Sequence, residues 1–227
     1  MKNSITIIAL ILTVNIYSQQ GKLFFETNYN TFSHSNLSDF QEEFKGDLSS
    51  IPLKTVDNFP ANIGFTLGYE IIPSNISLFL AYNATGGKLS YSDYSGIVKI
   101  EEALNAISFG AIYYIDLSDK KDFRIGLKAF SMYSSLSLDS YSEIQNYIEE
   151  DLVKLNSIDL GVGAQLNYEY PLSFLILKAN FGFDLVLGGK LIFKENTETH
   201  LIDNSNNSVK TGWSGLRTGI GIIIPIN

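Results

Sequence analysis

The sequence predicts an all-β fold: an eight-stranded antiparallel up-and-down transmembrane β-barrel with long outer loops. Three observations predict it. Eight segments alternate apolar and polar side chains, their connections are alternately long and short, and tyrosines recur at the segment ends. Only helices and closed barrels satisfy every backbone N–H and C=O group inside lipid. After residue 18, no stretch is apolar over the roughly 20 residues that a spanning helix needs.

Composition narrows the protein class further. A chain of 227 residues suits one domain, and 13% aromatic with only 18% charged residues favours β structure. The net charge is −8 and no Lys/Arg-rich stripe exists, so a nucleic-acid partner is excluded. The chain has no cysteine, which removes disulfides, thiol nucleophiles, Cys-zinc sites and a lipidated anchor.

Residues 1–18 have the pattern of a secretory signal peptide. Lys2 provides a short basic region, an apolar run extends from Ile5 to Val14, and Ile16, Tyr17 and Ser18 precede Gln19. The run is too short to span a bilayer. We therefore expect a cleaved signal peptide at 1–18, a barrel domain at 19–227 and localisation in the outer membrane.

Each predicted strand places apolar side chains on one face and polar or small side chains on the other. In the sixth, for example, Leu160 and Val162 alternate with Asp159 and Gly161. Lipid should contact the apolar face, and the polar face should line the barrel interior. The eight predicted strands are 22–31, 61–71, 76–85, 106–115, 123–133, 158–168, 175–187 and 215–226.

The connections between these segments are of two kinds. Residues 72–75, 116–122 and 169–174 form short connections, whereas 32–60, 86–105, 134–157 and 188–214 form long ones. Short periplasmic turns and long outer loops are typical of membrane barrels.

Tyrosines end six of the predicted strands on their lipid-facing side. An amphipathic ring is favoured at the level of the lipid headgroups, so we expect two aromatic girdles. The outer girdle would consist of Tyr29, Tyr82 and Tyr133, and the periplasmic girdle of Tyr69, Tyr113 and Tyr168.

Charged residues fall on the inward faces of the strands or at their ends. Because acids and bases are nearly balanced and an unpaired charge is costly in a narrow interior, we expect mutual ion pairs. An eight-stranded barrel is just wide enough to be filled by side chains, which predicts a plugged lumen. A narrow polar pore is the alternative. The predicted lumen charge network is Glu26, Glu70, Arg124, Lys128, Asp159, Glu169, Lys178, Asp184 and Arg217.

The long loops contain local signals. Capping-box patterns that begin at Ser38 and Ser142 predict short helices through Leu48 and Leu155, which would either bind a partner or pack over the barrel mouth. Glycines at 86–87 and the Asp-Tyr-Ser-Gly sequence at 93–96 suit turns in a loop that extends its hairpin beyond the membrane.

His34 and His200 are the two neutral-pH bases, and both lie in predicted outer loops. With neighbouring serines and acids they would resemble a lipid-hydrolase site at the outer rim. No nucleophile elbow and no His-x-x-x-His metal pattern accompanies them. The sequence therefore predicts no catalytic, cofactor-binding or metal site.

With the leader, the eight alternating strands and the tyrosine girdles, the mature chain resembles the small porin-like outer-membrane β-barrel proteins common in Bacteroidota. In size and topology it is similar to the OmpA and OmpX barrels. The resemblance implies insertion by the outer-membrane assembly machinery and roles in envelope integrity, adhesion or surface protection. It carries over no catalytic residue and no cofactor.

The leading hypothesis is a non-enzymatic barrel embedded in outer-membrane lipid, whose acidic extracellular loops meet an extracellular or envelope protein partner. A narrow small-solute pore or a secretion-accessory barrel is the alternative, and a loop-site lipid hydrolase is a third. At the level of the fold, a soluble lipocalin-like binder is the rival.

Overall fold

The computed structural model describes residues 21–145 and 147–226. The predicted signal peptide lies outside these residues. No helix within the described ranges is long and apolar enough to cross a membrane.

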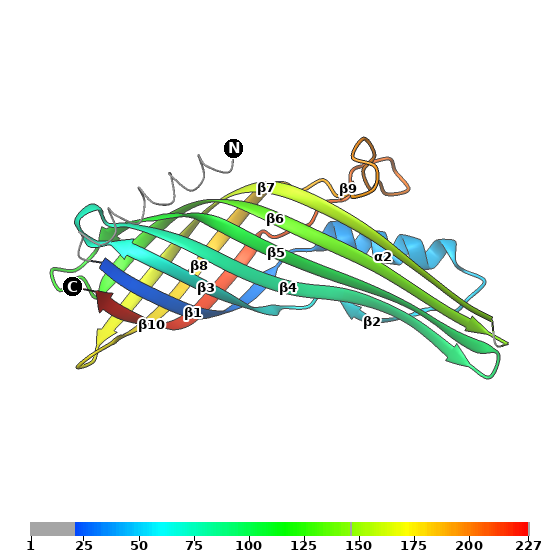
Figure 1. Ribbon diagram of the computed structural model, residues 1–227, viewed down its shortest axis with the longest axis horizontal. Helices are drawn as coiled ribbons and strands as arrows, with labels where there is room; N and C mark the ends of the chain where they lie inside the picture. The colour runs from blue at the N-terminus through cyan, green and yellow to red at the C-terminus, as the bar shows by residue number, and fades with distance from the viewer. Residues whose placement is uncertain (1–20, 146, 227) are drawn as a thin grey trace, which may run out of the picture.

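Eight antiparallel strands form a closed ring, because β1 pairs with β3 on one side and with β10 on the other. The predicted barrel is therefore confirmed (Figure 1). In ring order the strands are β1 (Gly21–Phe32), β3 (Asn62–Ile71), β4 (Ile76–Asp93), β5 (Gly96–Asp116), β6 (Phe123–Ile144), β7 (Tyr147–Pro171), β8 (Ile176–Gly188) and β10 (Gly215–Ile226).

The remaining elements differ between the two ends of the ring. At one end, called here the turn end, connections are short, and one of them is the 3₁₀ turn η1 (Ile72–Ser74). At the other, the loop end, lie the helix α2 (Ser35–Asp47), the strand β2 (Lys54–Asn58), which pairs with β4, and the short strand β9 (Ile192–Phe193), which pairs with β7.

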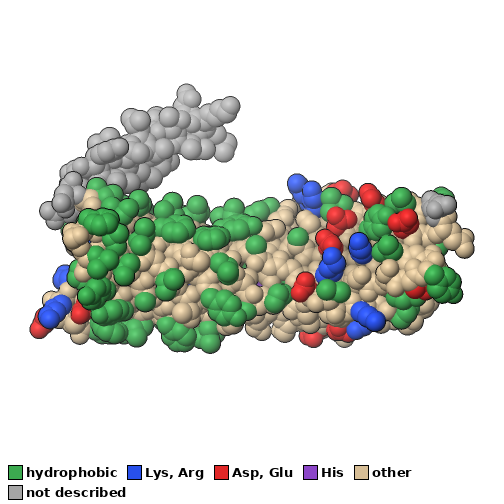
Figure 2. Space-filling view, turned by 90° about the horizontal axis from the view of Figure 1, so that it is seen from below, with side chains coloured by type: hydrophobic (Ala, Val, Ile, Leu, Met, Phe, Trp, Pro, Cys, Tyr) green, Lys and Arg blue, Asp and Glu red, His purple; other side chains and the backbone are tan. Residues whose placement is uncertain are grey.

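The outward surface of the ring is apolar up to a sharp limit. One register row across β4–β7 presents Tyr82, Ile107, Tyr133 and Ile158, all exposed. The next outward row toward the loop end is polar or small and consists of Ala84, Asn105, Ser135 and Asn156. Figure 2 shows the same division: hydrophobic side chains cover one half of the molecule, and Lys, Arg, Asp and Glu gather on the other.

Four strands continue beyond this limit. β4, β5, β6 and β7 extend as one curved sheet, called here the protruding sheet, with α2 alongside (Figure 1). At about 3.3 Å per residue, the stretch from Tyr133 to Ile144 is roughly 35 Å long. The expected hairpin extension at 86–105 is thus present, with its turn between Asp93 and Gly96.

The helix predicted at 142–155 is wrong, because these residues form the ends of β6 and β7. Ser142 pairs with Glu149 and Ser140 with Asp151, and β5 pairs with the other edge of β6 as far as Ile144. The partner strands supply hydrogen bonds up to Ile144 and again from Tyr147, which outweighs a local capping preference. The helix predicted at 38–48 is present but begins earlier, at Ser35, with His34 at the N-cap.

The six predicted girdle tyrosines lie on the outward face. Tyr29, Tyr82 and Tyr133 are near the loop end of the apolar surface, and Tyr113 and Tyr168 are near the turn end. Tyr69 is partly buried, since its phenol ring lies over Gly21. The phenol of Tyr82 donates to Asn105 Oδ1 at 2.7 Å, so its polar end meets the first polar row.

This surface makes a testable prediction. Leu127, which is 48% exposed and lies near the midpoint of the outward face of β6 between Phe123 and Tyr133, should tolerate a charge poorly. In lipid vesicles, Leu127→Arg should lower the free energy of unfolding by about 2–4 kcal/mol, measured by urea titration. Ser135→Arg, the first outward position beyond Tyr133 on the same strand, is the matched control and should be nearly neutral, because the residues opposite it, Asn105 and Asn156, are uncharged. Equal effects of the two changes would contradict a lipid boundary at the Tyr133 row.

Candidate functional site

The barrel interior at the turn end contains a buried cluster of ions. The Arg124 guanidinium forms two bonds with the Glu70 carboxylate, Nη1–Oε1 at 2.6 Å and Nη2–Oε2 at 3.0 Å, and also contacts Glu169. Lys22 reaches Glu169 Oε2 at 3.1 Å. The ring of Tyr114 lies 4.1 Å from Arg124 Cζ. These contacts join β1, β3, β5, β6 and β7 across the interior.

A second ion pair lies further into the barrel. Lys178 Nζ is 2.6 Å from Glu26 Oε1 and donates to the Tyr114 phenol oxygen at 3.1 Å. The second oxygen of Glu26 accepts from Asn180 Nδ2 at 2.9 Å. Lys178 also lies over the ring of Phe24, 4.3 Å from its centroid. The ammonium group is therefore enclosed by a carboxylate, a phenol and an aromatic ring.

The third cluster centres on Asp184. Lys128 Nζ lies 2.8 Å from Asp184 Oδ1, and Arg217 Nε lies 3.2 Å from Oδ2. The rings of Phe79 and Phe130 lie within 5.4 Å of the Lys128 ammonium. Both bases share one carboxylate, and the aromatic rings occupy the space beside them.

Asp159 departs from the expectation of mutual ion pairing. Its carboxylate accepts from Ser157 Oγ at 2.6 Å and from Thr211 Oγ1 at 3.3 Å, and no base of the described chain pairs with it. Asp159 lies at the loop end, where the chain leaves β8 through Gly188 and Gly189 with φ of 107° and 85°. One of its partners, Ser157, lies on the same strand, and the other, Thr211, comes from this loop, which sequence alone does not place.

The loop end of the interior is covered by α2 and by residues 189–214. Trp213 is fully buried, donates from Nε1 to Ser134 Oγ at 2.9 Å and contacts the rings of His34 and Phe32 edge-on. Leu37 of α2 and Leu191 and Leu201 of the loop join the same apolar cluster. One continuous cluster therefore extends from Phe24 inside the barrel to the covering segments.

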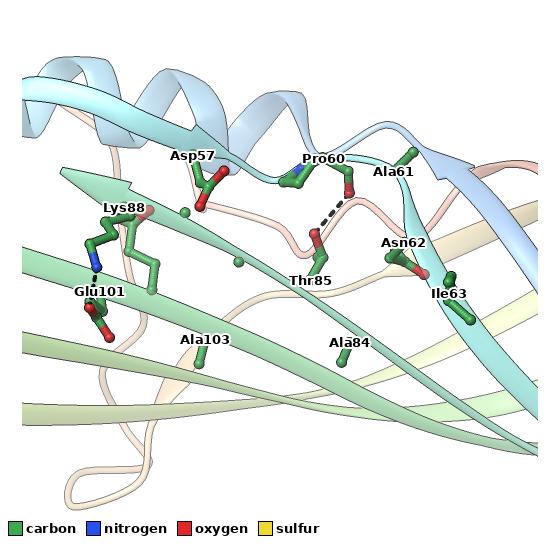
Figure 3. Close-up of a pocket in the computed structure, with 13 residues that line it drawn as sticks. Asp57, Pro60, Ala61, Asn62, Ile63, Ala84, Thr85, Lys88, Glu101 and Ala103 are labelled. Carbon is green, nitrogen blue, oxygen red and sulfur yellow. Dashed lines mark hydrogen bonds and ion pairs between the residues drawn. The ribbon is translucent and has the colours of Figure 1, made fainter.

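The wall of the barrel has a groove where β4 exchanges one partner for another. Its pairing with β3 extends to Asn83 and Gly64, and its pairing with β2 resumes at Gly87 and Asn58. The resulting groove has a volume of about 600 Å³ (Figure 3). Two hydrogen bonds cross it, from Phe59 N to Gly86 O and from Thr85 Oγ1 to Pro60 O, both 2.9 Å.

Beside this groove, a buried polar contact fixes α2 to the protruding sheet. Gln41 Nε2 donates to Glu102 Oε2 at 2.8 Å and to the Asp57 carbonyl at 3.2 Å. Gly87 makes room for it, because a Cβ there would lie 2.2 Å from Glu102 Oε2. Glu102 is not among the site residues predicted from the sequence, although inward alternation through Ile100, Glu102 and Leu104 could have indicated it.

Neither histidine is part of a nucleophile arrangement in the described chain. His34 is 4% exposed, its Nδ1 lies 2.6 Å from the Thr211 carbonyl, and burial lowers its pKa. His200 is exposed and forms a β-bridge with Ile192. No hydroxyl group of the described residues hydrogen-bonds to either ring, and no group of three or more metal-ligating side chains occurs within the described ranges.

Comparison with solved structures supports the fold. The chain is similar to a major outer membrane protein from Thermus thermophilus, with a TM-score of 0.52, 11% identity, and coverage of 91% of this chain and 99% of that chain. For Neisserial surface protein A the TM-score is 0.44 and the identity 14%, with coverage of 91% of this chain and 97% of that chain. For Ail, the attachment invasion locus protein of Yersinia pestis, the TM-score is 0.38 and the identity 8%, with the same two coverages. No protein-family model matches the chain, and no curated protein matches it in sequence.

At such low identity these similarities bear on the fold alone, and among these three the Thermus protein is the one whose TM-score exceeds 0.5. The chain thus has the architecture of a small outer-membrane β-barrel protein.

The interior pairs make a second prediction. Lys178→Met should lower the free energy of unfolding by about 3–5 kcal/mol, because Glu26 would remain buried without its counter-ion. Adding Glu26→Gln should recover more than half of that loss, since no charge would then be left unpaired. Urea titrations of the single and double variants in the same vesicles measure the difference. Additive losses would show that the two groups are not coupled.

Proposed function

We propose that this protein is a non-enzymatic outer-membrane barrel that presents the protruding sheet outside the cell, while its interior stays closed to solutes. The observation that carries the proposal is the continuation of β4–β7 far beyond the apolar surface. The signal-peptide pattern predicted at 1–18 and the apolar outer surface support export and insertion into the outer membrane by its assembly machinery. The loop end would then face the exterior.

Closure of the lumen is supported by the interior contacts. Three clusters of ion pairs follow one another along the barrel, and aromatic side chains such as Phe24, Phe79 and Phe130 lie between them. An eight-stranded barrel has little room beyond its own side chains. A narrow polar pore through the same residues remains the alternative function.

Planar-bilayer conductance tests closure. We expect no stable conductance steps from protein whose folding is shown by a heat-dependent shift in gel mobility. Steps whose size changes in Arg124→Ala, but not in Lys88→Ala on the outward surface, would establish a pore and contradict the proposal. Lys88 is a suitable control because its ion pair with Glu101 lies outside the barrel interior.

The protruding sheet has an open edge along β7. The Lys154 carbonyl on this edge accepts from Lys194 N at 2.9 Å. Backbone N–H and C=O groups alternate in direction along a strand, so those of Ile148, Glu150 and Leu152 point to the same side as the Lys154 carbonyl, away from β6. No described segment pairs with residues 147–153 there, and Leu152 N is bound by the carboxylate of Asp151 at 2.9 Å. The edge is therefore available for strand addition, in which a partner carbonyl would replace the Asp151 carboxylate at Leu152 N.

Charge indicates what this edge would accept. Glu149, Glu150 and Asp151 are consecutive and exposed. A second copy that paired antiparallel about Glu150 would set Glu149 opposite Asp151, and such like-charge pairs are unfavourable. An extended segment of a protein partner that carries Lys or Arg at alternate positions would instead complement the acids. We assign the outer surface interaction to this edge.

A peptide experiment tests this assignment. A labelled Lys-Val repeat of seven residues should bind the folded protein in nanodiscs, and the matched Glu-Val repeat should not. Replacing Glu149 and Glu150 by Gln and Asp151 by Asn should weaken binding roughly tenfold, because the acids on the face that carries the lysines lose their charge, whichever face that is. Asp119→Asn at the turn end is the control. Unchanged affinity in the triple variant, or equal binding of both peptides, would contradict the assignment.

A further inference from the structure

A cavity lies between α2 and the inward face of the protruding sheet. Its volume is about 170 Å³. The helix contributes two aromatic rings, and the three strands β5–β7 contribute aliphatic side chains and three polar groups. Phe44 is 37% exposed, so the cavity is reached from solvent on that side. The lining consists of Phe40, Phe44, Ile100, Glu102, Leu138, Ser140, Asp151 and Val153.

Glu102 in this lining has no positively charged partner among the described residues, although it is only 4% exposed. The buried carboxylates of the barrel interior provide the contrast. Glu26, Glu70, Glu169 and Asp184 each lie within 3.2 Å of a Lys or Arg nitrogen. Asp159 has no basic partner, but two hydroxyl groups donate to its carboxylate, whereas Glu102 accepts from one amide. Fully buried acids are rare unless they are paired. No cation of the described residues therefore neutralises Glu102, and a bound cation could do so.

A second acceptor nearby also lacks a donor. Gln41 is fully buried, and its amide orientation is fixed because the Asp57 carbonyl can only accept from Nε2. Its Oε1 consequently has no hydrogen-bond partner among the described residues. The neighbouring lysines are engaged elsewhere, Lys45 with Glu42 and Lys88 with Glu101. The residues that line the cavity thus offer acceptors and aromatic rings but include no Lys, Arg or His.

We propose that this cavity binds a small arylalkylammonium ion, with its ammonium group against Glu102 and its ring between Phe40, Phe44 and Leu138. An apolar cavity of about 150 Å³ accommodates benzene, so the present one admits a single ring with a short chain. Aromatic faces attract organic cations, and Phe40 and Phe44 would add to the attraction of the carboxylate. This site goes beyond the surface role proposed above and does not depend on it.

The site also has a defined pH response. Burial raises the pKa of Glu102 to about 7, and the hydrogen bond from Gln41 opposes that shift. The other groups packed around it are Gln41 on α2, the Asp57 carbonyl on β2, Ser140 on β6 and Asp151 on β7. An ammonium ion binds the carboxylate form. Its affinity should therefore rise about tenfold between pH 6 and pH 8 as Glu102 loses its proton.

Calorimetry with phenethylamine, using the full chain in nanodiscs, tests the site. We expect saturable binding by the unmodified protein and by Glu101→Gln, whose side chain is next in sequence but faces outward. Glu102→Gln, which keeps the shape of the side chain, should bind at least tenfold more weakly. Phenylethanol, the uncharged analogue, should also bind at least tenfold more weakly than phenethylamine. Titration of nanodiscs without protein corrects for partition into lipid.

If Glu102→Gln fails to fold, a second variant tests the site. Leu138→Trp fills the cavity without removing the carboxylate, and it should abolish phenethylamine binding while the heat-dependent gel shift is kept. Equal affinity of Glu102→Gln and the unmodified protein, loss of binding in Asp151→Asn alone, or the absence of saturable binding would each overturn the proposal.

Discussion

The structure depends first on the requirement that every backbone N–H and C=O group inside hydrocarbon finds a partner within the chain. The pairing of β1 with β10, from Gly21–Ile226 to Phe32–Gly215, meets this requirement by leaving no free strand edge in the ring. Closure then fixes which side chains point outward. Because direction alternates along each strand, one residue in two must be apolar for lipid, and the other half is confined to a narrow interior.

Confinement accounts for the chemistry of that interior. Charges that cannot reach water are held by opposite charges from strands distant in sequence, as in the pairs Arg124–Glu70 and Lys178–Glu26. Glycines on the inward face provide the space for large partners. A Cβ on Gly68 would lie 2.2 Å from Phe24 Cζ, and one on Gly161 would lie 2.2 Å from Phe130 Cζ. The rings and the long basic side chains therefore fill volume that these glycines leave empty.

Beyond the apolar surface a strand may have a free edge, because water can form hydrogen bonds with its backbone N–H and C=O groups. Four strands continue and four stop. β8 ends where Gly188 and Gly189 adopt positive φ, a conformation that favours glycine, and the chain then turns over the barrel mouth. α2 packs against the inward face of the sheet that remains, with Leu37 and Gln41 buried. An open β7 edge and a cavity beneath the helix both follow from this asymmetry.

The sequence by itself determined the ring, because lipid imposes a strict period of two. The segment predicted at 215–226 coincides with β10, and the segments at 22–31 and 61–71 agree with β1 and β3 to within one residue at each end. Outside lipid that period weakens, and Ser142, Glu149 and their neighbours have no local pattern that distinguishes a strand from a helix. The pairing of β6 with β5 as far as Ile144 decided that this segment is a strand and not a helix. The contacts of Asp159, Glu102 and Trp213 were likewise decided by the tertiary structure, because each joins a strand of the ring to a covering segment that has no repeating pattern.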